Sequence, residues 1–151
     1  SSDLIQESQN HSSILKDVKL INSKYPLAAL FVDYGHEKTI NGETLQAVRL
    51  HKAEHPLCSP GEADLSVCVD FASFKSQALD FGFEVDGPLS QSEFLIRLGL
   101  VERASRLMKD NPQNAGQIEM DAVRLVAAHG MGTRFKVICL RTKDLPVLIN
   151  F

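Results

Sequence analysis

Residues 27–32 read Leu27-Ala28-Ala29-Leu30-Phe31-Val32 and are followed at once by Asp33-Tyr34-Gly35-His36. A continuous apolar run of strand length between turn residues is typical of a strand buried on both faces, as in a parallel sheet. Pro26 ends the preceding segment, because proline pushes the residue before it out of the helical region. In open parallel sheets ligands bind at the carboxyl ends of strands. The polar residues 33–36 are therefore candidates for a functional site.

Helices and strands alternate along the rest of the chain. Apolar spacing predicts helices at about 13–22, 71–81, 90–98, 100–108 and 117–129, and strands at about 44–50, 65–69, 83–85 and 135–140. Ser12 or Ser13 could cap the first helix and Asp70 the second, and Ser90 with Glu93 has the spacing of a capping box. Residues 145–151 are expected to form a third strong strand or a loose tail.

The composition of the chain limits the kinds of partner that it is expected to bind. At 151 residues it is one domain or a piece of one, and its net charge is −3. Lysine and arginine runs that mark nucleic-acid or membrane surfaces are absent from the sequence. No apolar stretch reaches the roughly 20 residues that span a bilayer. We therefore expect neither nucleic acid nor a membrane as a partner.

Two patterns bear on metal and redox chemistry. Cys58, Cys68 and Cys139 are odd in number and lack metal-type spacing, so we expect reduced thiols and a reducing compartment. The segment from His51 to His55 matches the H-x-x-E-H pattern of one class of zinc peptidases. That chemistry needs both histidines on one helical face, which the proline that follows disfavours. We expect no metal site.

Three aspartates lie where predicted elements end. Asp33, Asp64 and Asp70 could bind a guanidinium group, which prefers carboxylates in bidentate geometry. Each of them could equally serve as a cap or a turn residue. His36 and His51 could accept a proton from a nucleophile, although a surface histidine is the commoner case. Tyr34 and Gln91 could position a substrate through hydrogen bonds.

Five short segments occur in a fixed order along the chain. They are Asp33-Tyr34-Gly35-His36, Pro60-Gly61-Glu62-Ala63-Asp64-Leu65, Val69-Asp70-Phe71, Gly87-Pro88-Leu89-Ser90-Gln91 and Met131-Gly132-Thr133-Arg134-Phe135-Lys136-Val137. Together they resemble the C-terminal part of the MidA-like family of S-adenosylmethionine (SAM)-dependent methyltransferases. The match runs from about Leu27 to Leu140. Ser66 departs from the family's pattern, which has a threonine, but keeps the hydroxyl.

This resemblance implies an α/β fold, namely the C-terminal part of a Rossmann-like class I methyltransferase. Residues 27–32 would be the fifth strand, and 83–85 and 135–140 the last two, the final one antiparallel. Residues 90–129 would be the family's added C-terminal helices. Residues 1–26 would be a polar, helical lead-in and 27–151 the C-terminal part of the methyltransferase domain. The residues that hold SAM are expected upstream of residue 1, which makes this chain a C-terminal fragment.

The resemblance also implies methyl transfer to a protein arginine nitrogen, linked in relatives to assembly of respiratory complex I. On the substrate side, the expected catalytic residues are Asp33, Tyr34 and His36. The expected substrate-binding residues are His51, Asp64, Asp70 and Gln91. The reaction is an in-line displacement, so alignment of the two reactants carries much of the rate.

A non-catalytic module that binds an assembly partner is the alternative function. Either way, a sheet cut before its fifth strand leaves an unpaired edge that invites association. The expected partners are a protein substrate and, at that edge, the missing N-terminal half or a second copy of the chain. The first expectation for the compartment is bacterial cytoplasm, and the alternative is the mitochondrial matrix.

Overall fold

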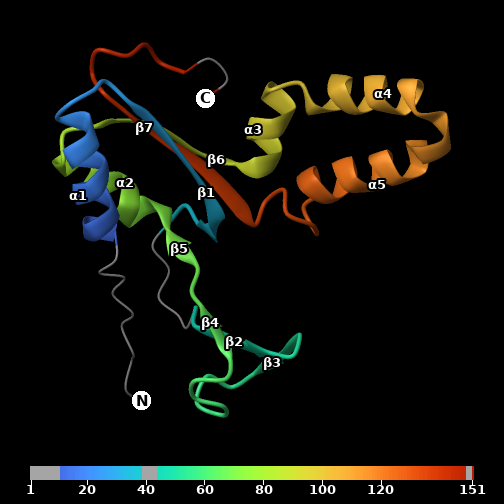
Figure 1. Ribbon diagram of the computed structural model, residues 1–151, viewed down its shortest axis with the longest axis horizontal. Coiled ribbons are helices and arrows are strands. Elements are labelled where there is room, and N and C mark those ends of the chain that lie inside the picture. The colour runs from blue at the N-terminus through green and yellow to red at the C-terminus, as the bar shows by residue number, and fades with distance from the viewer. Residues whose placement is uncertain (1–10, 39–43, 149–150) are drawn as a thin grey trace.

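The computed structural model describes residues 11–38, 44–148 and 151. The helices are α1 (His11–Asn22), α2 (Phe71–Asp80), α3 (Gln91–Arg97), α4 (Leu100–Asp110) and α5 (Ala115–Val126), with a 3₁₀ turn, η1, at Pro112–Asn114. The strands are β1 (Ala28–His36), β2 (Gln46–Arg49), β3 (Lys52–Glu54), β4 (Asp64–Ser66), β5 (Val69–Asp70), β6 (Glu84–Ser90) and β7 (Phe135–Arg141). They form a four-stranded sheet, ordered β5-β1-β7-β6, and a small sheet, ordered β3-β2-β4 (Figure 1).

The last strand of the chain lies between β1 and β6. Strand β7 is antiparallel to both neighbours, and its register with β1 runs from Ala28 opposite Arg141 to Tyr34 opposite Phe135. Strands β1 and β6 are consequently parallel to each other. The prediction of two late strands with the final one antiparallel is confirmed.

One face of this sheet carries the core. Helices α1 and α2 supply Leu15, Phe71 and Phe74, which pack with Ile138 and Leu140 of β7. Residues on the same face of β1, such as Phe31, pack against this cluster. The hydrophobic effect acting on these side chains is the main term that holds the helices on the sheet.

The prediction that residues 27–32 are buried on both faces is wrong for the part of the chain that the structure describes. Side chains alternate between the two faces of a strand. Phe31 points toward α2, whereas Leu30 and Val32 on the other face are 51% and 48% exposed. Helices α1 and α2 cover one face of β1, so only that face of the apolar run is packed.

Several boundaries also differ from the prediction. Strand β1 continues through His36, so the polar segment 33–36 belongs to the strand instead of following it. Helix α1 already includes Ser12 and Ser13, so neither residue caps it. Strand β6 continues to Ser90 across an irregularity between Asp86 and Leu89. Residues 145–148 form no strand, and 149–150 lie outside the described residues.

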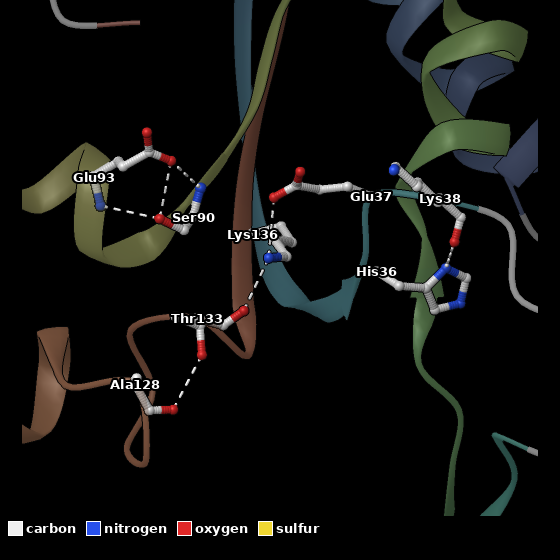
Figure 2. A network of polar contacts seen from close by, with 8 residues as sticks. All are labelled: His36, Glu37, Lys38, Ser90, Glu93, Ala128, Thr133 and Lys136. Atoms are coloured by element: carbon white, nitrogen blue, oxygen red, sulfur yellow. Dashed lines mark hydrogen bonds and ion pairs between the residues drawn. The ribbon is translucent and has the colours of Figure 1, made fainter.

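Other local signals are confirmed. The side chain of Asp70 accepts a hydrogen bond from the Ser73 amide at 2.9 Å and caps α2. Ser90 and Glu93 form the predicted capping box at the start of α3 (Figure 2). Helices α4 and α5 then form an antiparallel pair that extends to one side of the main sheet (Figure 1). No helix within the described ranges is long and apolar enough to cross a membrane.

Candidate functional site

A pocket of about 530 Å³ lies where three parts of the fold meet. These parts are the carboxyl end of β1, the small sheet with its exit toward β5, and the loop from α5 to β7 (Figure 1). Its lining residues are Tyr34, Gly35, Gln46, Ser66, Cys68, Arg124, His129, Gly130, Met131, Arg134 and Phe135. The location agrees with the general rule for ligands at the carboxyl ends of strands.

The loop from α5 to β7 is held in place by backbone contacts. The amide of Met131 donates to the carbonyl of Arg124 at 3.0 Å. A Cβ on Gly132 would lie 2.0 Å from the Val126 carbonyl oxygen, so only glycine fits there without a backbone shift. The sequence Gly130-Met131-Gly132 is thus a tight turn packed against the end of α5.

Side chains tie the same loop to β1 and β7, as Figure 2 shows. Thr133 Oγ1 donates to the carbonyl of Ala128 at 3.0 Å. Lys136 Nζ donates to the carbonyl of Thr133 at 2.9 Å and also lies 3.0 Å from Glu37 Oε1. The Gly35 amide adds a bond to the Arg134 carbonyl at 3.1 Å. One wall of the pocket is therefore fixed relative to β1.

Tyr34 and Gly35 form the β1 side of the pocket. The Tyr34 ring packs edge-on against Phe135, with centroids 6.0 Å apart. This contact orients the phenol, whose hydroxyl can donate or accept a hydrogen bond. A Cβ on Gly35 would lie 2.2 Å from the Val69 carbonyl oxygen, so the glycine allows β5 to pair with the end of β1.

Basic residues line this pocket, and the guanidinium groups of Arg124 and Arg134 give it a positive charge. Arg124, His129 and Arg134 line it, and no aspartate or glutamate is among the lining residues that the structure describes. In the described part of the chain, none of these three side chains takes part in an ion pair or hydrogen bond. The pocket is therefore suited to an anionic group, which guanidinium can bind through two parallel hydrogen bonds.

Of the three expected catalytic residues, Tyr34 is the one that lines the pocket. Asp33 is exposed and lies on the opposite face of β1, across from Lys136, where its Oδ1 accepts from the Tyr34 amide at 2.8 Å. His36 is half-buried, and its Nδ1 lies 2.6 Å from the Lys38 carbonyl oxygen (Figure 2). The three residues are neighbours in β1, but their side chains do not converge on the pocket.

The four expected substrate-binding residues lie outside the pocket lining. His51 is exposed in the β2–β3 turn, where it and Leu50 have positive φ angles of 63° and 49°, as in a type I′ turn. This hairpin is not the helix that a zinc peptidase motif requires. Asp64 is exposed on β4, two residues before Ser66.

Asp70 and Gln91 have structural contacts instead. Asp70 is the N-cap of α2. Gln91 is buried, and its Nε2 donates to the Leu125 carbonyl at 2.8 Å, which joins α3 to α5.

Most of the polar pocket residues were missed from the sequence. Gln46, Ser66, Arg124 and His129 come from elements far apart in the chain. Arg134 lies in the family-like segment 131–137, beside the Gly130-Met131-Gly132 turn. The clustering of basic residues on both sides of that turn was the signal that could have found the site.

The comparisons with known proteins agree with this fold. A family model of S-adenosyl-L-methionine-dependent methyltransferases matches residues 7–89, more than half of the chain. The chain therefore belongs to this family, the MidA-like SAM-dependent methyltransferases, as the motifs predicted.

Curated relatives carry the name protein arginine methyltransferase NDUFAF7, mitochondrial. The Caenorhabditis elegans homolog is 35% identical over 125 residues, which are 81% of this chain and 28% of that protein. The Danio rerio protein is 33% identical over 146 residues, which are 90% of this chain and 34% of that protein. The Homo sapiens protein is 32% identical over 115 residues, with 26% of its length covered. The chain thus spans about a third or less of these relatives.

Solved structures show the same fold. A superfamily member from Burkholderia thailandensis, bound to S-adenosyl-homocysteine, superposes with a TM-score of 0.78 at 23% identity, over 93% of this chain and 38% of that one. A second structure of a protein from the same organism gives 0.79 at 23% identity, over 93% of this chain and 40% of that one. The predicted fold class, a partial class I methyltransferase fold, is confirmed.

The glycines of the structure indicate whether these residues can hold the cofactor of this family. A nucleotide cradle needs a glycine turn that follows a strand and opens a helix. Gly130 and Gly132 follow α5 and precede β7, and both pack against carbonyl groups of α5. Within 11–38, 44–148 and 151, the glycines do not form such a cradle, so we place no cofactor contacts on these residues.

Proposed function

We propose that this chain forms the acceptor side of a SAM-dependent methyltransferase that modifies an arginine of a protein. Membership in the family and the names of the curated relatives support the activity. The observation that supports the location is the pocket at the carboxyl end of β1, lined by Tyr34 of the Asp33-Tyr34-Gly35-His36 segment. SAM supplies the methyl group in this family.

The role of this chain's own residues is to hold and orient the acceptor. Tyr34, Gln46 and Ser66 offer hydrogen-bonding groups in the pocket, and Met131 and Phe135 offer apolar surface. Tyr34 is the catalytic residue that we favour. Asp33 and His36 remain proposed catalytic residues on the flanks of Tyr34. His51, Asp64, Asp70 and Gln91 remain proposed for substrate binding, with capping or packing roles of their own for the last two.

We further propose that the protein works in the mitochondrial matrix in preference to bacterial cytoplasm. The relatives that support this are named as mitochondrial proteins. A contribution to the assembly of respiratory complex I follows from the family resemblance.

A methylation assay tests this proposal. The protein, in the longest form that its gene encodes, is incubated with methyl-labelled SAM and arginine-containing acceptor peptides. Peptide mass spectrometry then locates the added methyl group, which we expect on an arginine nitrogen. Tyr34→Phe should lower the turnover by about a hundredfold or more, the range expected for loss of one catalytic hydrogen bond. Tyr25→Phe is the matched control, because Tyr25 is 68% exposed and does not line the pocket.

The second candidate function is a non-catalytic module that binds an assembly partner. The observation that favours it is the missing strand–glycine–helix cradle among the described residues. Thermal unfolding with saturating S-adenosyl-homocysteine distinguishes the two candidates. If the cofactor site is complete, the ligand should raise the free energy of unfolding by about 2.7 kcal/mol at a concentration 100 times its Kd. No shift in Tm for the longest form of the protein would favour the module.

A further inference from the structure

We propose that the pocket at the end of β1 binds an acidic side chain of the protein substrate, next to the methyl-accepting residue. This inference rests on the proposed function, because it specifies which protein segments that function would select. The acceptor group itself is not assigned to the cationic part of the pocket. A guanidinium placed among two arginines would be repelled by their like charges.

The proposal rests on the basic residues that line the pocket. Arg124 extends from the last turns of α5, His129 from the loop after it, and Arg134 from the residue before β7. They face one pocket from both sides of the Gly130-Met131-Gly132 turn. A carboxylate can bind two guanidinium groups at once, because each of its oxygens accepts more than one hydrogen bond.

The acidic residues at the end of β1, Asp33 and Glu37, do not line the pocket. Glu37 is paired with Lys136 at 3.0 Å, and Asp33 lies on the other face of the strand. The fold therefore separates its acidic and basic groups at the end of β1. The two arginines of the pocket can therefore pair with an anion from outside the chain.

The rest of the lining suits a peptide better than a small free anion. The pocket volume of about 530 Å³ is in the range of sites for drug-sized ligands. Met131 and Phe135 provide apolar surface beside the cations, which fits the aliphatic stem of a glutamate. A nucleic acid is a poor fit, because the net charge of the chain is −3.

Two cysteines provide a direct assay with a built-in control. Cys68 lines the pocket, whereas Cys58 is exposed and lies outside the lining. The probe is a capped peptide with glutamates on both sides of one arginine, and the control peptide has glutamines in their place. Rates of iodoacetamide labelling are measured for each cysteine by mass spectrometry. We expect the glutamate peptide to slow the labelling of Cys68 severalfold and to leave Cys58 unchanged.

Charge-removing variants test which residues are responsible. Arg124→Gln and Arg134→Gln should each raise the peptide concentration that gives half-maximal protection by about tenfold, a factor that corresponds to about 1.4 kcal/mol of binding energy. Arg106→Gln on α4 is the matched control, because Arg106 is exposed and outside the pocket lining. All three positions are exposed, so the fold should be retained, and circular dichroism checks this.

Several outcomes would overturn the inference. Equal protection by the glutamine peptide would remove the role of the carboxylates. Displacement of the glutamate peptide by phosphate at equal concentration, by single-stranded RNA or by S-adenosyl-homocysteine would assign the cations to a free anion, a nucleic acid or the cofactor.

The methylation assay separates this inference from the proposed function. If both peptides are methylated with the same kcat/KM, the function stands and the acidic preference is wrong. If neither peptide is methylated while the glutamate peptide still protects Cys68, the proposed function fails and the pocket remains a site for acidic segments. Methylation of both, with a lower KM for the glutamate peptide, supports both proposals.

Discussion

Lys136 Nζ lies 3.0 Å from Glu37 Oε1, and this ion pair joins the start of β7 to the residue that follows β1. The lysine side chain is only 13% exposed and also donates to the Thr133 carbonyl. It therefore connects the end of β1, which carries Tyr34, to the start of β7, which Arg134 precedes. The link adds to the β1–β7 pairing beside the candidate site.

Removal of the lysine charge should destabilise the protein and loosen that wall. We expect Lys136→Met to lower the free energy of unfolding by about 1–2 kcal/mol, because a carboxylate and a carbonyl lose their partner. Urea unfolding measures the loss. Lys143→Met is the control, since Lys143 is exposed in the segment after β7. A loss no larger than that of the control would show that the link is not structural.

The glycine turn after α5 should tolerate no side chain. We expect Gly132→Ala to cost more than about 2 kcal/mol, because its Cβ would lie 2.0 Å from a backbone oxygen that cannot rotate away. Gly116→Ala in α5 should have the opposite sign and stabilise by roughly 0.5–1 kcal/mol, since nothing lies within 4 Å of its added carbon. Thermal or urea unfolding compares the two. Equal effects at both sites would contradict the described position of the loop.

His11 should make the stability depend on pH. Burial against Phe74 lowers the pKa of His11 from its ordinary value of 6.5, with a smaller opposing effect from Asp70. The unfolded chain then binds a proton at a pH where the folded chain does not, so the free energy of unfolding falls as the pH drops through about 6.5. His11→Leu should reduce this fall, measured by urea unfolding at several pH values.

His51→Gln is the control for that series, because His51 is an exposed turn residue. An unchanged pH profile for His11→Leu would mean that other groups cause the acid sensitivity.

The outer edge of β1 should favour association. Strand β5 pairs with β1 only at Gly35 and His36, and Leu30 and Val32 are exposed beside the rest of that edge. Within the described residues, β1 has β7 as its only partner from Ala28 to Tyr34. We expect the 151-residue chain to self-associate in sedimentation experiments at high concentration. Val32→Lys should reduce this association, and Leu50→Lys on the hairpin turn should not. A monomer at all concentrations would contradict the expectation.

The sequence was a good guide wherever the signal is local. The run 27–32, the proline before it and the apolar residues 135–140 predicted the two strands that pair along the sheet. Ser90 and Asp70 were predictable as caps, because a cap depends on residues three positions apart. The order of the family's motifs then identified the fold class.

The site was harder to predict, because it is made by tertiary contacts. Arg124 and His129 looked like ordinary residues at the end of a helix, and only the folding of β4 toward the α5–β7 loop places Ser66 near them. Asp33 and Tyr34 were grouped from the sequence, but a strand sends consecutive side chains to opposite faces. The packing of β1 on one face could not be predicted either, since an apolar run does not indicate which helices cover the strand.

Photo-crosslinking tests most directly whether the pocket is the acceptor side. The probe is an arginine-containing peptide with a neighbouring benzoylphenylalanine, and mass spectrometry maps the adducts. We predict adducts on Met131, which lines the pocket, and suppression of these adducts by an unlabelled acceptor peptide. Met120 is the internal control, because it is 66% exposed on α5 and lies outside the lining. Adducts on Met120 alone, or adducts that the unlabelled peptide does not suppress, would contradict the proposed location of the acceptor site.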